Sequence, residues 1–349
     1  MTSEWKTSPL RDLVGFISKG IAPSYTDEKS ETTVRVLNQK CNRNFRITYS
    51  ESRLHDLARK KVPAERFVRI DDILINSTGA GTAGRIAQIC NLPCDTIVDG
   101  HMIIIRANDK VLQKYLGYAL KAHQWEVLQL DEGSTGQTEL NRERLLDEII
   151  IGFPTSLELQ EAIVKTLEGI DRKLLLNEKV NDNLQQQAAA LFANFYDQAE
   201  TEVGFTEIIQ ILGGGTPKTG ESSYWNGNVP FFTPKDVGLP YTITTEKTIT
   251  EEGLAHCNSR LYPINTVFVT ARGTVGKVGL PGVPMAMNQS CYALVGKDTH
   301  QLLVYFYTLK VVDRLKHKAS GAVFDAITTR DFESEIIMKL SDDDAKAFL

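Results

Sequence analysis

The pattern of apolar and polar positions along this chain occurs twice. An apolar stretch at 72–76 is followed by a glycine-rich turn and then by the run Gly-Thr-x-Gly-basic-apolar at 81–86. The same succession recurs at 265–269 and 273–278, about 190 residues later. Short apolar runs bounded by glycine turns are typical of strands. The pattern therefore predicts two copies of one α/β domain.

Further matches keep the same order and extend both copies. They pair Leu140 with Ile327, Glu148–Ile150 with Glu335–Ile337, and more loosely Lys19–Pro23 with Gly213–Pro217. We therefore expect an α+β fold, with similar α/β domains at 1–154 and 198–340.

Residues 155–197, between the copies, follow a different period. Thr155 or Ser156 can cap a helix, Glu158 falls in its first turn, and the segment contains no proline after that point. Apolar residues recur in alternating steps of four and three, which is the heptad seam of a coiled coil interrupted by two asparagines. The seam residues are Ile163, Leu167, Ile170, Leu174, Leu184, Leu191 and Phe195. One helix cannot bury this seam, so we expect a partner helix; the alternative is a core helix packed on one domain.

The distribution of charge is uneven. The 349 residues carry a formal net charge of −5, which argues mildly against nucleic-acid binding. Residues 35–69, however, contain ten Lys or Arg and three acidic residues. This local excess fits a DNA reader that also docks on proteins, and it fits an ordinary solvated surface equally well.

Composition also indicates the cellular setting. No apolar run is long enough to span a membrane, and the N-terminus has no basic-then-apolar signal pattern, so we expect a cytoplasmic protein without membrane contact. The five cysteines are scattered, which suggests reduced thiols. Cys90 and Cys94 have no second ligand pair, so we expect no metal site.

Two glycine motifs resemble nucleotide-binding loops but fail their requirements. Gly79–Gly84 matches the dinucleotide fingerprint, yet 85–90 is a short apolar stretch rather than a long helix. Ala271 takes the place of the first fingerprint glycine in the second copy, so we expect a tight hairpin that can meet a DNA phosphate. In Gly215–Gly220, a possible phosphate loop, Glu221 stands where lysine is required. No hydrolase, zinc-protease or amino-methyltransferase motif occurs, so no catalytic residues are expected.

The second copy contains the most specific run. Gly213–Thr219 reads Gly-Gly-Gly-Thr-Pro-Lys-Thr, and 224–237 reads Tyr-Trp-Asn-Gly-Asn-Val-Pro-Phe-Phe-Thr-Pro-Lys-Asp-Val. This run resembles the opening of a target recognition domain of type I restriction–modification specificity (S) subunits. The first copy, with Ile17–Gly20 and Val34–Lys40, looks like a diverged version, and the helix at 155–197 resembles the family's coiled-coil spacer helix. The resemblance covers essentially the whole chain.

The resemblance implies a division of labour within a complex. Two target recognition domains each read one half of a bipartite site in double-stranded DNA, and the spacer helices set the distance between the halves. Two methyltransferase (M) subunits dock on the S subunit and methylate adenine with S-adenosylmethionine. A restriction (R) subunit uses ATP and Mg to translocate and cleave unmodified DNA. The S subunit would then be a non-catalytic recognition subunit without a cofactor of its own.

By this resemblance the DNA-binding residues lie in loops. Cations and backbone amides suit phosphates, Arg suits guanine, and Asn or Gln suits adenine. The candidates in the first domain are Lys19, Asn38, Gln39, Lys40, Asn42, Arg43, Asn76 and Arg85. Those in the second are Gly214, Gly215, Thr216, Lys218, Lys235, Arg272, Thr274 and Lys277, with Asn288 and Gln289 as weaker ones. For any single residue, an ordinary polar role in a loop is the simpler alternative.

The last residues depart from the family pattern. S subunits usually carry a second spacer helix after the second domain, antiparallel to the first. Here 341–349 corresponds to the start of such a helix and the chain then stops, so we expect a truncated second spacer helix. The unpaired seam could then serve a homodimer or M subunits.

Two other functions stay open at this point. A solo nuclease or methyltransferase would need a carboxylate cluster or a cofactor loop, and the sequence offers neither. A non-DNA adaptor could bind protein, or carbohydrate through Tyr224 and Trp225, although we expect these aromatic residues to pack beneath a loop. Salt-sensitive DNA affinity would separate both from a DNA reader.

Overall fold

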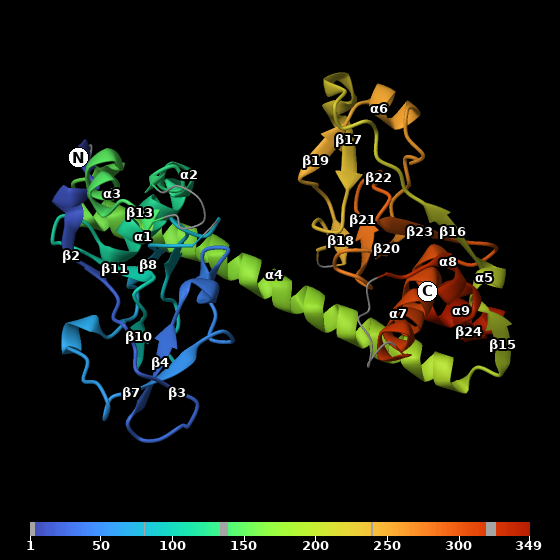
Figure 1. The fold of residues 1–349 in the computed structure, drawn as a ribbon, viewed down its shortest axis with the longest axis horizontal. Helices are drawn as coiled ribbons and strands as arrows, with labels where there is room; N and C mark the ends of the chain where they lie inside the picture. Colours follow the sequence, from blue (N-terminus) through green and yellow to red (C-terminus); the bar gives the residue numbers. More distant parts are fainter. Residues whose placement is uncertain (1–3, 80, 133–138, 239, 319–325) are drawn as a thin grey trace. The chain divides into compact units, whose positions relative to one another are not determined.

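The computed structural model describes residues 4–79, 81–132, 139–238, 240–318 and 326–349 (Figure 1). The chain divides into two compact units, Met1–Asn177 and Glu178–Leu349. Their largest apolar clusters share no residue, so each unit folds around a core of its own.

The first unit contains fourteen named strands within the described residues. They are β1 (Trp5–Pro9), β2 (Val14–Lys19), β3 (Tyr25–Thr26), β4 (Thr33–Leu37), β5 (Asn42–Arg43), β6 (Arg46–Ile47), β7 (Arg53–Asp56), β8 (Ile73–Asn76), β9 (Ile86–Gln88), β10 (Thr96–Val98), β11 (Met102–Ala107), β12 (Asp131–Glu132), β13 (Glu139–Leu140) and β14 (Ile150–Pro154). One sheet has the order β2-β11-β8-β9, and a second has the order β10-β4-β7-β3 with β10 parallel to β4. Strand β1 pairs with β14, which joins the start of the domain to its end.

Alternation along the central strands explains this layering. In β8, Ile73 and Ile75 belong to the main core, whereas Leu74 belongs to a second cluster on the other face. Successive side chains of a strand point to opposite faces, so a fully apolar strand requires cover on both. The main core is covered by short helices, namely η1 (Leu10–Leu13), α1 (Gln113–Ala122), α2 (Gln124–Val127) and α3 (Arg142–Glu148).

The second unit repeats this plan. Its strands are β15 (Thr201–Gly204), β16 (Ile209–Gly213), β17 (Trp225–Phe232), β18 (Tyr241–Thr242), β19 (Lys247–Ile249), β20 (Val267–Thr270), β21 (Val278–Pro281), β22 (Ala286–Met287), β23 (Cys291–Gly296) and β24 (Ile336–Lys339). The sheet order β16-β23-β20-β21 corresponds to β2-β11-β8-β9, the parallel pair β17–β22 to β4–β10, and the pair β15–β24 to β1–β14. Its helices are α5 (Phe205–Ile208), α6 (Glu251–Ala255), α7 (Gln301–Lys318), α8 (Thr329–Glu333) and α9 (Asp342–Phe348). The predicted duplication is confirmed by this shared topology.

Hydrogen bonds correct one detail of the predicted alignment. Ala271 donates its N–H to Ser290 O (2.7 Å) and accepts from Ile327 N (2.9 Å). Ser77 makes the same two bonds, to His101 O and from Leu140 N, both at 2.8 Å. Ala271 therefore corresponds to Ser77 rather than to Gly79, because the turn of the first copy is longer. Strand β9 follows that turn, which confirms a hairpin in place of a dinucleotide fold.

Helix α4 (Leu157–Gln198) is continuous over 42 residues, as the seam predicted. Gln160 and Val164 are buried in the first unit, and Phe192 and Tyr196 are buried in the second. Most of the predicted seam is open to solvent, since four of its members are about half exposed: Ile170, Leu174, Leu184 and Leu191. The helix thus packs on its two domains mainly through residues beside the seam. No helix in the described ranges is both long and apolar enough to cross a membrane.

The described part of 341–349 forms helix α9, which packs on the second core. Phe348 lies edge-on to Phe192 and to Phe306, with ring centroids 5.6 and 5.1 Å apart. Ser341 caps the helix, accepting a hydrogen bond from Asp344 N (3.1 Å).

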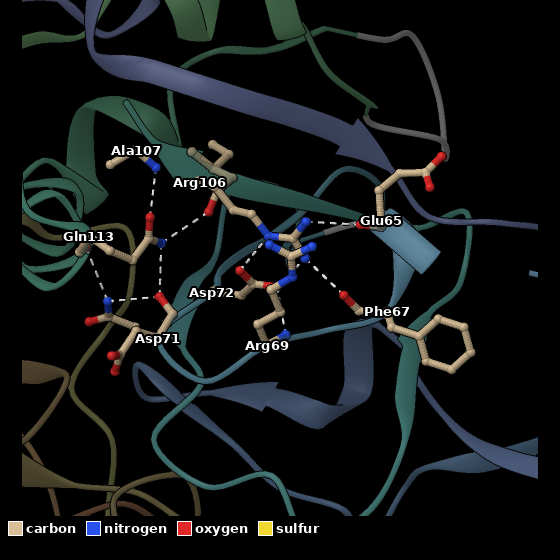
Figure 2. Close-up of polar contacts among 10 residues, drawn as sticks. Glu65, Phe67, Arg69, Asp71, Asp72, Arg106, Ala107 and Gln113 are labelled. Carbon is tan, nitrogen blue, oxygen red and sulfur yellow. Dashed lines mark hydrogen bonds and ion pairs between the residues drawn. The ribbon is translucent and has the colours of Figure 1, made fainter. Parts of the chain in front are cut away.

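A buried ion pair ties the residue just before β8 to β11 in the first unit (Figure 2). Arg106 makes a bidentate contact with Asp72, each N–O distance being 2.7 Å, and the two side chains are 12% and 3% exposed. The same guanidinium donates to the carbonyl oxygens of Glu65 (2.9 Å) and Phe67 (2.8 Å), and Asp72 accepts from Arg69 N (2.8 Å). One arginine therefore fixes the segment that leads into β8.

Candidate nucleic-acid interface

Four loops of the first unit are hydrogen-bonded into one group, which we call the first loop cluster. It consists of residues 19–23, 38–41, 77–79 with 81–85, and 99–101. The bonds that join these loops, or the strand residues directly beside them, run from Gly20 N to Met102 O (2.8 Å), Ser77 N to His101 O (2.8 Å), Asp99 N to Leu37 O (3.0 Å) and Asn76 Nδ2 to Gln39 O (3.1 Å). Candidate residues far apart in the sequence are thereby brought together.

The second unit contains an equivalent group, the second loop cluster. It consists of residues 213–218, 233–237, 271–277 and 288–290. The bonds that join these loops, or the strand residues directly beside them, run from Gly215 N to Met287 O (3.1 Å), Asn288 N to Phe232 O (2.9 Å), Ala271 N to Ser290 O (2.7 Å) and Thr274 Oγ1 to Pro234 O (3.2 Å). Each domain thus presents one loop cluster at the same ends of corresponding strands.

Close backbone approach explains the glycines in these clusters. A Cβ atom on Gly20 would overlap the carbonyl oxygen of Asp99, and one on Gly214 would overlap that of Asn288. A Cβ on Gly215 would lie 2.6 Å from Asn258 N. Only glycine lets these segments pass so near another backbone. The predicted candidates Gly214 and Gly215 therefore shape the cluster by having no side chain.

Three asparagines predicted as base readers make hydrogen bonds within the first domain through at least one side-chain amide atom. Asn42 and Asn76 are fully buried, and Asn42 Nδ2 donates to Asn76 Oδ1 (3.2 Å) and to Arg85 O (2.8 Å). Asn38 accepts from Lys40 N (2.8 Å) and donates to Glu51 O (2.7 Å). These amides hold neighbouring loops in place.

The charged candidates of the first domain lie closer to solvent. Lys40 and Arg43 are exposed, and Lys19 is exposed while paired with Glu139 at 2.6 Å. Arg85 is half-buried and donates to Gly81 O (3.0 Å). Part of the basic excess at 35–69 has a structural use. Lys60 binds Ala22 O (2.6 Å), and Arg66 binds Lys19 O, so these cations hold the 19–23 loop.

The second loop cluster also presents charge and polar groups to solvent. Exposed candidates are Lys218, Lys235, Arg272, Thr274 and Lys277, with Lys235 lying 3.5 Å from a carboxylate oxygen of Glu246. Thr216 donates its hydroxyl to Gln289 Oε1, and Gln289 is exposed. Lys277 corresponds to Arg85, because Gly276 N and Gly84 N make equivalent bonds to Thr270 O and Asn76 O, each at 2.8 Å.

One equivalent position differs in charge between the clusters. Asp99 accepts from His101 N (2.9 Å), and Asn288 accepts from Ser290 N (3.0 Å), so both cap the same turn. Asp99 is 4% exposed, and burial raises the pKa of its carboxyl. The first domain therefore keeps an ionisable group where the second has an amide.

We expect Asp99→Asn to raise the melting temperature at neutral pH and to change it little in acid. Because the folded-state pKa of Asp99 is raised, stability from its neutral carboxyl is present below the unfolded pKa of about 4 and is lost as pH rises through the folded pKa. Thermal unfolding of both proteins from about pH 4 to about pH 7 measures the difference. A pH-independent difference would contradict this explanation, and Asn288→Asp should show the opposite trend.

A family profile now matches these two domains and most of the chain. The profile described as "Type I restriction modification DNA specificity domain" matches residues 2–186 and again 201–339. The chain belongs to this specificity family. The double match agrees with the duplicated topology and with the predicted resemblance.

Individual members of the specificity family match parts of the chain. The type I restriction enzyme MjaIX specificity subunit of Methanocaldococcus jannaschii is 32% identical over 124 residues, covering 34% of this chain and 29% of that protein. The EcoR124I/EcoR124II specificity subunit of Escherichia coli is 27% identical over 213 residues, covering 57% and 51% respectively. These matches span about a third and about half of the two relatives' own lengths.

A solved specificity subunit has the same fold. The type I restriction-modification system S subunit from M. genitalium aligns with 99% of this chain and 88% of its own, with a TM-score of 0.54 and 15% identity. At that identity the likeness concerns the fold alone, namely two specificity domains separated by a long helix.

Sequence reasoning missed Asp236, which organises a loop of the second specificity domain. Asp236 accepts from Thr233 N (2.8 Å) and from Glu246 N (2.8 Å), and so closes the loop that carries Lys235. A Thr-Pro-Lys-Asp run is a turn signal that could have indicated this role. Trp225 packs edge-on to Phe231 and donates to Lys218 O (3.2 Å), which confirms that it lies beneath a loop.

Proposed function

We propose that this specificity-family chain reads two separate segments of double-stranded DNA, one with each loop cluster. The observation that carries the proposal is the pair of equivalent clusters, each combining close backbone approaches with exposed cations. Loop amides and cations together suit phosphates, while the side chains between them can reach base edges.

The candidate residues divide by exposure. Phosphate contacts fall to Lys19, Lys40, Arg85, Lys218, Lys235 and Lys277, and to the loop amides of Thr216 and Thr274. Gly214 and Gly215 donate their N–H groups to Cys291 O and Met287 O, so they shape the loop instead. Base contacts fall to Arg43 in the first domain and to Arg272 and Gln289 in the second, which are exposed. Asn38, Asn42 and Asn76 position the first cluster, and Gln39 supports it through its backbone carbonyl.

The seam of α4 is the proposed surface for assembly. Its half-exposed members, such as Ile170, Leu174 and Leu184, form an apolar stripe that another helix could cover. Candidate occupants are a helix of an M subunit or a second copy of this chain. In such a complex the M subunits would hold S-adenosylmethionine and any R subunit would use ATP and Mg. This chain would select the sequence in cytoplasmic DNA on which the complex acts. It would catalyse neither methylation nor cleavage.

Methylome sequencing tests the proposal directly. Cells that express this chain with its M subunit should gain N6-methyladenine in a split, asymmetric motif, because two non-identical domains read its halves. Scrambling residues 213–237 should abolish the modification, while the M subunit still co-purifies with the chain. Absence of new methylation from a stable complex would contradict the proposal. A palindromic motif would indicate two copies presenting the same domain.

A further inference from the structure

A strained hairpin projects from the first loop cluster. Strands β5 and β6 pair Arg43 with Arg46, which leaves a two-residue turn of Asn44 and Phe45. Their φ angles are 52° and 60°, as in a type I′ turn, where glycine is strongly preferred at the second position. Asparagine tolerates this conformation, but a bulky aromatic residue is a rare outlier there. Phe45 therefore costs stability at a position where glycine would cost little.

The strained residue faces solvent. Phe45 is 41% exposed, and Arg43 and Arg46 beside it are exposed as well. The base of the hairpin is fixed, since Cys41 is fully buried and Ile47 packs against the same cluster. This aromatic tip sits on a fixed base in an unfavourable backbone conformation, and it belongs to none of the apolar clusters formed by the described residues. Such strain is typical of residues kept for function.

The hairpin is joined to the proposed DNA-reading loops. Asn42, the first residue of β5, binds Asn76 Oδ1 (3.2 Å) and Arg85 O (2.8 Å). The second domain is built differently here, because the strand that follows its 233–237 loop is β18, which pairs in parallel with β21. Within the described residues, the tip is thus a feature of the first domain only and can distinguish the two readers.

We propose that the tip of the β5–β6 hairpin enters the major groove of the first half-site and that Phe45 packs against a thymine methyl group. The inference rests on the proposed function, because it assumes that the first loop cluster faces DNA. The major groove admits a two-stranded ribbon, and an apolar side chain such as Phe suits the thymine methyl. Arg43, the base-contact candidate of this domain, flanks the turn and would enter the same groove beside Phe45.

Phe45→Gly separates this role from a structural one. Glycine relieves the strain of the turn, so the variant keeps or gains thermal stability. DNA reading should nevertheless weaken. In selection from duplexes with a random segment, using the full chain with its M subunits, preference for one T·A pair in one half-site should fall roughly tenfold. The other half-site should be unchanged. Ile70→Ala is the control, since Ile70 is exposed in the turn at the opposite end of β8 and should keep the whole motif.

The possible outcomes separate a failure of this inference from a failure of the proposed function on which it rests. If the wild-type complex enriches no motif, the proposed function itself fails. If wild type enriches a bipartite motif and Phe45→Gly enriches the same motif equally, only the hairpin inference is overturned. A uniform loss of affinity without loss of base preference also overturns it, because the tip would then touch only the backbone. A lower melting temperature for Phe45→Gly would show that the phenyl ring serves packing instead.

Discussion

Gly214→Ala should strongly reduce base preference in the half-site that we assign to the second domain. Base preference in the other half-site should be kept. The added methyl group would overlap the carbonyl oxygen of Asn288 and lie 2.7 Å from that of Met287. Both neighbours are backbone atoms, so the 213–218 loop must move away from 288–290. We expect a local cost on the order of 2 kcal/mol and a loss of base preference of roughly tenfold or more in that half-site.

The first domain provides the reciprocal test. Gly20 makes the equivalent approach to Asp99, so Gly20→Ala should erase the other half of the motif. Duplex selection with each variant would show two complementary losses if each loop cluster reads one half-site. Gly220→Ala is the matched control, because a Cβ atom there meets open space and the residue lies outside the second loop cluster. A Gly214→Ala protein that keeps its full motif would contradict our assignment of the second cluster.

The period of the sequence predicted the largest features of the fold. Repeated strand and turn patterns indicated the duplicated domains, and the four–three spacing indicated a long helix at 155–197, close to the observed Leu157–Gln198. Which face of that helix is buried was harder to predict. Phe192 and Tyr196 are buried beside the seam, since each end of the helix packs on a domain whose position is set by tertiary contacts.

The roles of single polar residues could not be predicted from the sequence. Asn42 and Asn76 looked like base readers because amides suit adenine, yet they bind each other and the carbonyl oxygen of Arg85. That pairing spans 34 residues and depends on how two loops meet. Phe45 had no sequence signal, because its conformation becomes visible only once Arg43 is known to pair with Arg46.

Arg106→Ala should destabilise the first domain far more than the loss of a surface ion pair would. The guanidinium holds Asp72 with two bonds of 2.7 Å and also satisfies the carbonyl oxygens of Glu65 and Phe67 (Figure 2). Removing it leaves a carboxylate that is only 3% exposed without its partner, which typically costs about 3–5 kcal/mol. Hydrogen exchange should accelerate in β8 and β11, whereas peptides of the second unit should keep their rates.

Arg144→Ala is the matched control, because Arg144 makes a similar bidentate contact with Glu148 at the surface. Its Nε–Oε1 distance is 2.6 Å, but the side chains are 37% and 49% exposed. Solvent screens such a pair, so its loss should cost far less stability than the loss of the Arg106 guanidinium. Equal costs for the two variants would show that burial does not determine the strength of the Arg106–Asp72 interaction.

A double variant separates the free-energy cost of an unpaired buried charge from the stabilisation that the ion pair itself provides. Arg106→Met keeps apolar volume against the Phe16 ring, over which Arg106 lies at 4.7 Å, but leaves the Asp72 carboxylate without its cation. Adding Asp72→Asn removes that charge and keeps an oxygen acceptor for Arg69 N. Because an unpaired buried charge accounts for much of the cost of breaking such a pair, the double variant should be more stable than Arg106→Met alone. If the second substitution instead destabilises the protein further, the carboxylate must stabilise the turn before β8 independently of Arg106.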